Sequence, residues 1–135
     1  MGTLFADTSY YVALFLRTDN LTHEARRLAQ SHMNDQIVTC EAVWVELFAH
    51  LTRSDEHVRL EALGALDDLR RDPLVTIVPQ TGELFEDGLE LYRRRLDKRY
   101  SLTDCMCMTI CTRLDIREVL THDHNFEQEG FTILL

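Results

Sequence analysis

The chain has 135 residues, of which 45% are hydrophobic and 27% are charged, and its formal net charge at pH 7 is -9. These values are typical of a globular protein, and we expect residues 1–135 to form a single domain. No apolar run reaches the roughly 18 residues of a membrane-spanning helix. The N-terminus also lacks the basic region of a signal peptide, so we expect a cytoplasmic protein with no membrane partner.

Apolar, β-branched stretches alternate with amphipathic ones along the chain. The expected elements are, in order, a strand at 3–6, helices at 8–16 and 22–32, a strand at 36–40, helices at 41–52 and 56–71, a strand at 75–78, helices at 82–97 and 102–114, and strands at 118–121 and 131–135. This alternation predicts an α/β fold, a three-layer α/β/α sandwich around a mostly parallel sheet of about five short strands.

Four acidic residues lie at the boundaries of these elements. Asp7 follows the first predicted strand, and Asp123 follows the fourth. Ligands of parallel α/β sheets bind at the carboxyl ends of strands, so these two carboxylates face one site if the two strands are neighbours. Glu46, at the margin of an apolar helix stripe, and Asp104, at the start of a later helix, are placed to complete the site.

Carboxylates in such positions are costly to bury unless they bind something. A shared divalent cation is the natural candidate, because Mg²⁺ takes oxygen ligands and binds through a few carboxylates together with a substrate phosphate. The pattern therefore indicates a metal-dependent enzyme acting on phosphate esters. Without metal the clustered carboxylates repel one another, so we expect at least one raised pKa.

Each acid also has a purely structural alternative. Asp7 is a candidate N-cap of the helix that follows it, and Asp104 is a candidate capping-box residue. Asp123 fits an Asx-turn, and Glu46 is placed either to extend its carboxylate to solvent or to pair with Arg53 or another base.

Other residues that carry chemistry have simpler expected roles. Cys105 and Cys107 lie on nearly opposite sides of a helix and cannot share one zinc ion, so we expect free cysteines packed as small hydrophobic side chains. His122 and His124 are expected to be exposed loop residues, because the other candidate ligands are all hard oxygens. Trp44 is expected in the core, with stacking on a nucleic-acid base as the alternative.

Four segments resemble the signature blocks of PIN-domain ribonucleases, in order and spacing across the whole chain: Leu4 to Ser9, Val45 to Leu47, Leu102 to Asp104 and Leu120 to Phe126. The length is similar to that of the VapC toxins of VapBC toxin–antitoxin pairs. The resemblance implies an endoribonuclease that hydrolyses RNA phosphodiester bonds with Mg²⁺ or Mn²⁺. It implies catalytic and metal-ligand roles for the same four residues, Asp7, Glu46, Asp104 and Asp123. Many members carry a further acid where this chain has Asn125.

The resemblance also implies partners, namely a homodimer and a cognate antitoxin that lays a segment into a groove near the acids. The early helices offer Tyr10, Tyr11, Leu14 and Phe15 as exposed residues lining that groove, with a place in the core as the alternative.

Five cations fall within seven residues before Asp104 and are candidates for binding RNA phosphates: Arg93, Arg94, Arg95, Lys98 and Arg99. The alternative is a solvated face at a helix end, which the helix dipole favours. Local clustering of this kind offsets the acidic balance of the chain, which otherwise opposes nucleic-acid binding.

Three other functional classes remain as alternatives. A PIN-like scaffold that binds partners without catalysis shares the fold. A haloacid-dehalogenase phosphatase requires a second aspartate where Ser9 stands. A receiver domain requires an acidic pair after the first strand and a lysine after the last, whereas the only lysine here is Lys98.

Overall fold

The computed structural model describes residues 2–18 and 20–135. Its strands are β1 (Thr3–Ala6), β2 (Gln36–Cys40), β3 (Val75–Val78), β4 (Glu118–Leu120) and β5 (Thr132–Ile133). Its helices are α1 (Thr8–Phe15), α2 (Thr22–Ser31), α3 (Glu41–His50), α4 (Glu56–Arg71), α5 (Gly82–Arg94), α6 (Leu102–Arg113) and α7 (Asn125–Gln128).

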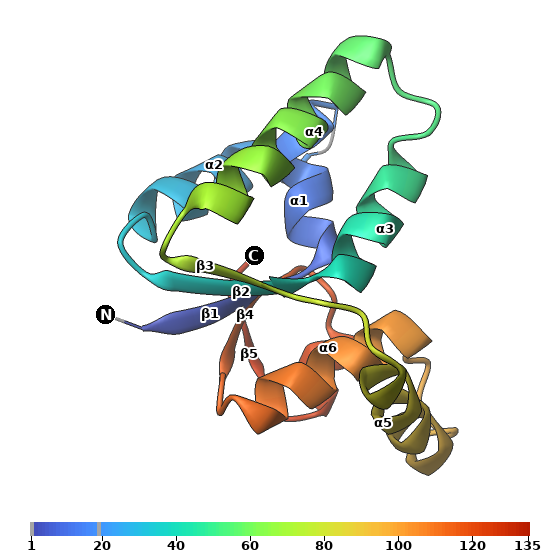
Figure 1. Ribbon diagram of the computed structural model, residues 1–135. Coiled ribbons are helices and arrows are strands. Elements are labelled where there is room, and N and C mark those ends of the chain that lie inside the picture. Colours follow the sequence, from blue (N-terminus) through green and yellow to red (C-terminus); the bar gives the residue numbers. More distant parts are fainter. Residues whose placement is uncertain (1, 19) are drawn as a thin grey trace.

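The five strands form one sheet in the order β3-β2-β1-β4-β5, and every neighbouring pair is parallel. Helices α1 to α4 lie on one side of this sheet, and α5 and α6 lie on the other (Figure 1). The predicted α/β sandwich is therefore confirmed. The central strand β1 is covered on both faces, and its residues Leu4, Phe5 and Ala6 are all at most 2% exposed.

The aromatic side chains of α1 and α3 pack together above the sheet. Trp44 is 3% exposed, and its ring centroid lies 4.7 Å from that of Tyr11. Trp44 therefore belongs to the core, as expected. Tyr10 and Tyr11 are also buried, so their expected exposure is wrong and the alternative, a place in the core, is confirmed.

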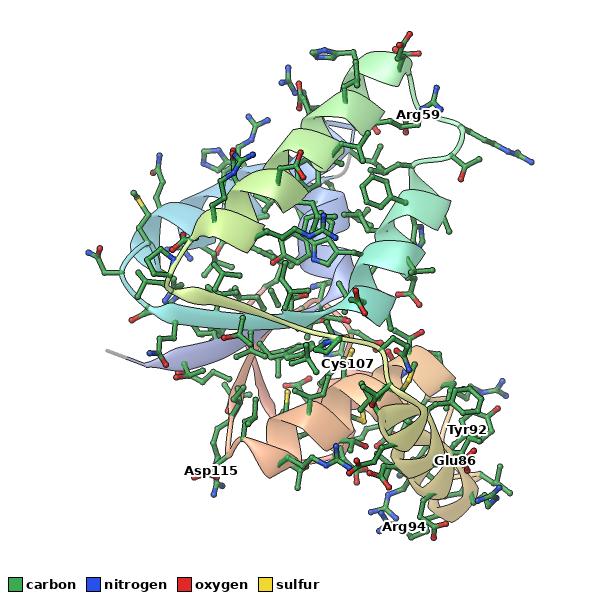
Figure 2. The ribbon with its side chains drawn as sticks, in the orientation of Figure 1. Arg59, Glu86, Tyr92, Arg94, Cys107 and Asp115 are labelled. Atoms are coloured by element: carbon green, nitrogen blue, oxygen red, sulfur yellow. The ribbon has the colours of Figure 1, made fainter. Side chains whose placement is uncertain are left out.

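The cysteines are free and buried, as expected. Cys107 points from α6 toward the sheet (Figure 2), where its Sγ lies 3.9 Å from Sγ of Cys40 at the end of β2. The two thiols pack the layer between the sheet and α6.

Helix α7 was not expected, because its residues are polar and follow a turn. It begins where Phe126 N–H donates to the Asp123 carbonyl, and it is anchored by Phe126, which is fully buried. Helix α5 ends at Arg94, three residues before its predicted end. The chain turns at Arg95, whose side chain is bound by Glu129 at the end of α7.

No helix in the described part of the chain is both long enough and apolar enough to cross a membrane.

Candidate active site

The sheet topology places two of the four acids side by side. β1 and β4 are adjacent and parallel, with Ala6 opposite Leu120, so Asp7 and the segment leading to Asp123 leave the same edge. The sequence places Asp7 and Asp123 at one site only if their two strands are neighbours, and β1 and β4 are neighbours. The next strand after β1 in the chain lies on its other side, so this edge is the point where strand order reverses and ligands are expected.

One cavity of about 360 Å³ opens at this edge, and all four acids line it. Asp7 comes from the end of β1, Glu46 from α3, Asp104 from α6 and Asp123 from the segment after β4. The structure thus brings together four residues that are spread over 117 positions of sequence.

Asp7 is the most deeply buried of the four, at 4% exposure. It occupies the N-cap position of α1 but makes no side-chain capping bond, so the capping alternative is wrong. Its carboxylate is instead held from β4, because the Thr121 hydroxyl donates to Oδ2 of Asp7 over 2.9 Å.

Ser9 and Thr121 hold this contact in place through their hydroxyl groups. Neither residue was selected from the sequence. The single Thr121 proton is directed at Asp7, so the Ser9 hydroxyl donates to Oγ1 of Thr121 over 2.9 Å. Ser9 Oγ in turn accepts from His122 N–H, and Thr121 Oγ1 accepts from Asp123 N–H. Their positions beside Asp7 and Asp123 in the signature blocks were the available signal.

Asp104 forms the capping box that its structural alternative described. Its Oδ2 accepts from the Ser101 backbone N–H over 2.9 Å, while its own N–H donates to the Ser101 hydroxyl over 3.0 Å. The box uses Oδ2 and fixes the carboxylate in the lining of the cavity. Capping and a role in the site are therefore compatible.

Asp123 likewise forms the expected Asx-turn, since its Oδ1 accepts from Asn125 N–H over 2.9 Å. Glu46 is half-buried, and within the described residues no ion pair joins it to Arg53 or to another base. The pairing alternative for Glu46 is thus wrong, because its side chain lines the cavity instead.

Burial and charge both disfavour ionisation in this cavity. Burial is the largest cause that raises the pKa of Asp7 to about 7, with repulsion from Asp104 and Glu46 adding to it. Burial also raises the pKa of Asp104, with repulsion from Asp123 and Glu46 as further causes. The expectation of at least one raised pKa is confirmed. Its larger cause is burial away from water, and the repulsion between carboxylates, on which the expectation was based, is a smaller cause.

The chemistry of the donors fits a hard divalent cation. Four carboxylates converge, and none of them is neutralised by an ion pair in the part of the chain that is described. Among the described residues no three acidic, histidine or cysteine side chains are placed so that together they could hold a metal ion directly. Mg²⁺ retains several waters, so it needs few direct ligands, and a cavity of about 360 Å³ has room for them.

Two histidines also line the cavity. His50 lies one helical turn after Glu46 on α3 and was missed by the sequence reading. His122 is exposed, and its Nδ1 lies 3.1 Å from the Leu135 carbonyl oxygen. His124 is exposed as well and contacts Glu127, so the expectation of exposed loop histidines is confirmed.

The five clustered cations lie at the end of α5 and in the loop before α6. None of them lines the cavity of the acids, as far as residues 2–18 and 20–135 show. Arg93 pairs loosely with Glu90 at 3.6 Å, and Arg94 projects from α5 (Figure 2). Arg95 differs from the rest because Glu129 binds its guanidinium through both carboxylate oxygens.

A family model described as the PIN domain matches residues 4–131. A search of curated proteins found no match. Among solved structures, Mycobacterium tuberculosis VapC20, described as a toxin that cleaves the sarcin-ricin loop, is 26% identical with a TM-score of 0.82, covering 96% of each chain.

Two toxin–antitoxin structures share the fold at lower identity. VapBC2 from Rickettsia felis, bound to a DNA fragment of its promoter, is 12% identical with a TM-score of 0.65, covering 98% of this chain and 97% of that one. FitAcB from Neisseria gonorrhoeae is 14% identical with a TM-score of 0.67, covering 98% and 96%.

Proposed function

This chain belongs to the PIN domain family, and from that premise we propose that it is a metal-dependent endoribonuclease that hydrolyses RNA phosphodiester bonds. One observation carries the proposal. Four carboxylates from four separate segments line one cavity without a cationic partner in the described residues, an arrangement that is costly unless a cation is bound there.

In this proposal Asp7, Glu46, Asp104 and Asp123 hold Mg²⁺ or Mn²⁺. When bound, the ion supplies positive charge that stabilises the charge developing on the phosphate oxygens and makes a water more acidic. The Thr121 hydroxyl keeps the Asp7 carboxylate in place, and the capping box keeps Asp104 in place. With a pKa of about 7, Asp7 exchanges a proton near neutral pH until a cation binds.

The chain is further proposed to be the toxin of a toxin–antitoxin pair, acting in the cytoplasm, where its RNA substrate lies. The similarity to a toxin described as cleaving the sarcin-ricin loop, with a TM-score of 0.82, supports this role. In the basic run, Arg93, Arg94, Lys98 and Arg99 are the proposed contacts to RNA phosphates. Arg95 joins them only if it releases Glu129.

An antitoxin segment is proposed to occupy an apolar groove of about 370 Å³ against α1, α2 and α4. Tyr10, Tyr11, Leu14 and Phe15 all line this groove, while Thr8, Ser9 and Val12 of the same helix line the cavity of the acids. A segment bound in the groove therefore packs against the helix that begins at the site. Asp35, Asp68 and Asp72 on the groove wall favour a segment with basic residues.

A homodimer is proposed across α3. Val45 is 71% exposed there, and Ala42, Ala49 and Met106 line an apolar cleft that adjoins Glu46. An exposed apolar patch beside a charged site is typical of a protein interface. Light scattering on the purified chain distinguishes the dimer from a monomer of 15.8 kDa.

The proposed activity is tested by measuring cleavage of RNA with Mn²⁺ for wild type, Asp7→Asn, Glu46→Gln and Asp104→Asn. Each change keeps the side-chain shape and removes a ligand charge, so we expect at least a hundredfold loss in kcat. Glu86→Gln, an exposed change on α5 (Figure 2), is the matched control and should cleave normally. Full activity in all three site variants would contradict the proposal, and an inactive wild type would favour the non-catalytic scaffold.

A further inference from the structure

The segments that carry Asp104 and Asp123 are joined behind the site by side chains. Asn125 Nδ2 donates to the Arg99 carbonyl over 3.2 Å, and the Tyr100 hydroxyl donates to Oε2 of Glu129 over 2.9 Å. Arg95 adds three bonds to the same carboxylate, two from Nε and one from Nη2. We call this set of contacts between the loop 95–101 and residues 125–129 the α7 bridge.

Each end of the α7 bridge is coupled directly to one acid. Ser101, the last residue of the loop, holds Asp104 in the capping box. Asn125, the first residue of α7, holds Asp123 through its backbone N–H. The α7 bridge therefore joins the two segments that hold these carboxylates.

The contacts that hold the Asp104 and Asp123 carboxylates in place must resist the repulsion between their like charges. Asp104 and Asp123 line the same cavity, so two like charges are held within one site. The bridge is well placed to resist that repulsion, because Tyr100 is 5% exposed and the Glu129 side chain is 16% exposed. Partly buried, charge-assisted bonds of this kind are stronger than exposed ones.

The Asn125 contact requires a donor. A carbonyl oxygen only accepts, so the group that faces Arg99 must be the amide NH₂. The other amide atom, Oδ1, lies 3.4 Å from Nε2 of Gln128. An aspartate at this position has no donor, and it would place negative charge against the Arg99 carbonyl.

We propose that Asn125 is a positioning residue that, with Glu129, sets the separation of Asp104 and Asp123 in the site, and that it does not occupy the place of a fifth metal ligand. This proposal rests on the proposed metal-dependent function. If position 125 were a ligand position that lacks its acid, Asn125→Asp should strengthen Mn²⁺ binding. The proposal predicts instead that Asn125→Asp weakens it.

The test is Asn125→Asp, compared with wild type in Mn²⁺ titration calorimetry and in steady-state RNA cleavage. We expect the Mn²⁺ Kd to rise about tenfold, as for other groups that orient metal ligands, and kcat to fall with little change in KM. Asn34→Asp is the matched control: it adds the same charge in an exposed turn at the opposite edge of the sheet, and it should bind Mn²⁺ as wild type does. Tighter or equal Mn²⁺ binding with equal or faster cleavage in Asn125→Asp would overturn the proposal.

Glu129→Gln provides a second route should Asn125→Asp fail to fold. It keeps an acceptor for Tyr100 and loses the charge that binds Arg95, so the Mn²⁺ Kd should rise about threefold, and Glu129→Ala should raise it further. An unchanged Kd in both Glu129 variants would also overturn the proposal. If wild type itself binds no Mn²⁺ and cleaves no RNA, the proposed function fails; if wild type does both and the variants match it, only the positioning role fails.

Discussion

Thr121 donates its hydroxyl proton to Oδ2 of Asp7, across the pair of strands that ends at the site. The Thr121 hydroxyl oxygen, Oγ1, itself accepts from the Ser9 hydroxyl and from the Asp123 backbone N–H. One buried hydroxyl thus ties the first acidic segment of the chain to the last, and it does so without adding charge to the cavity.

Thr121→Val should remove this tie while keeping the shape of the side chain. The Asp7 carboxylate loses the one side-chain donor that it has among the described residues, and the Asp123 N–H loses its acceptor. We expect the free energy of unfolding to fall by about 1–3 kcal/mol, the usual cost of leaving a buried polar group unpaired. Urea unfolding measures this, and Mn²⁺ affinity should weaken in parallel. Thr121→Ser keeps the hydroxyl and should lie much closer to wild type in both measurements.

The raised pKa of Asp7 makes metal-free stability depend on pH. Between about pH 4 and pH 7 the folded protein keeps a proton on Asp7 that the unfolded chain has lost, because the folded-state pKa is about 7 and the ordinary value is 3.8. The free energy of unfolding therefore falls as pH rises through this window, by on the order of 4 kcal/mol at most. Asp7→Asn should remove this fall, so the variant should be more stable than wild type at pH 8 and similar to it below pH 4.

Mn²⁺ or Mg²⁺ should make wild type more stable than Asp7→Asn at pH 8, which reverses their order of stability without metal. The ion binds the folded wild type and raises its melting temperature, whereas Asp7→Asn has lost a ligand and should gain little. Thermal melts with and without EDTA measure both effects. A wild-type melting temperature that does not respond to either ion would argue against metal binding at this cavity.

The close contact between Gly88 on α5 and Met106 on α6 leads to a separate prediction about stability. A Cβ added at Gly88 would lie 2.6 Å from Cγ of Met106, which is itself buried. Gly88→Ala should therefore lower the free energy of unfolding by about 1–2 kcal/mol, despite the better helix propensity of alanine. Gly64→Ala on α4 has open space around its Cβ and should raise it by about 0.5–1 kcal/mol. Denaturant unfolding of the two variants compares them directly.

Much of the fold was predictable because its signals are local. β-branched runs bounded by Pro73 and Pro79 gave β3 its limits, and the Ser101 to Asp104 spacing marked the start of α6. The grouping of the acids was predictable because parallel strands deliver their ends to one edge. The residue pattern alone left strand order open, so the approach of Asp7 to Asp123 was only conditional.

The unpredicted features depend on contacts between distant residues. Nothing local to Thr121 shows that its hydroxyl meets Asp7, 114 positions away. Helix α7 has only four residues and owes its place to buried Phe126 and to Glu129, which binds Arg95 from another segment. For the same reason Arg95 looked equivalent to its neighbours in sequence, although its surroundings differ.

Because Arg95 is bound by Glu129 and Arg93 and Arg94 are not, the basic run requires two separate experiments. Arg93 and Arg94 are exposed, so replacing both with Ala should leave the melting temperature unchanged while weakening RNA binding. Two lost phosphate contacts on a single strand reduce the slope of log affinity against log salt concentration by about 1.4. Arg95→Ala should instead lower the melting temperature, because the Glu129 side chain, which is 16% exposed, loses its charged partner. Fluorescence anisotropy of labelled RNA over a salt series and thermal melts separate these outcomes. Equal salt slopes for wild type and the double variant would mean that Arg93 and Arg94 form only a solvated helix end.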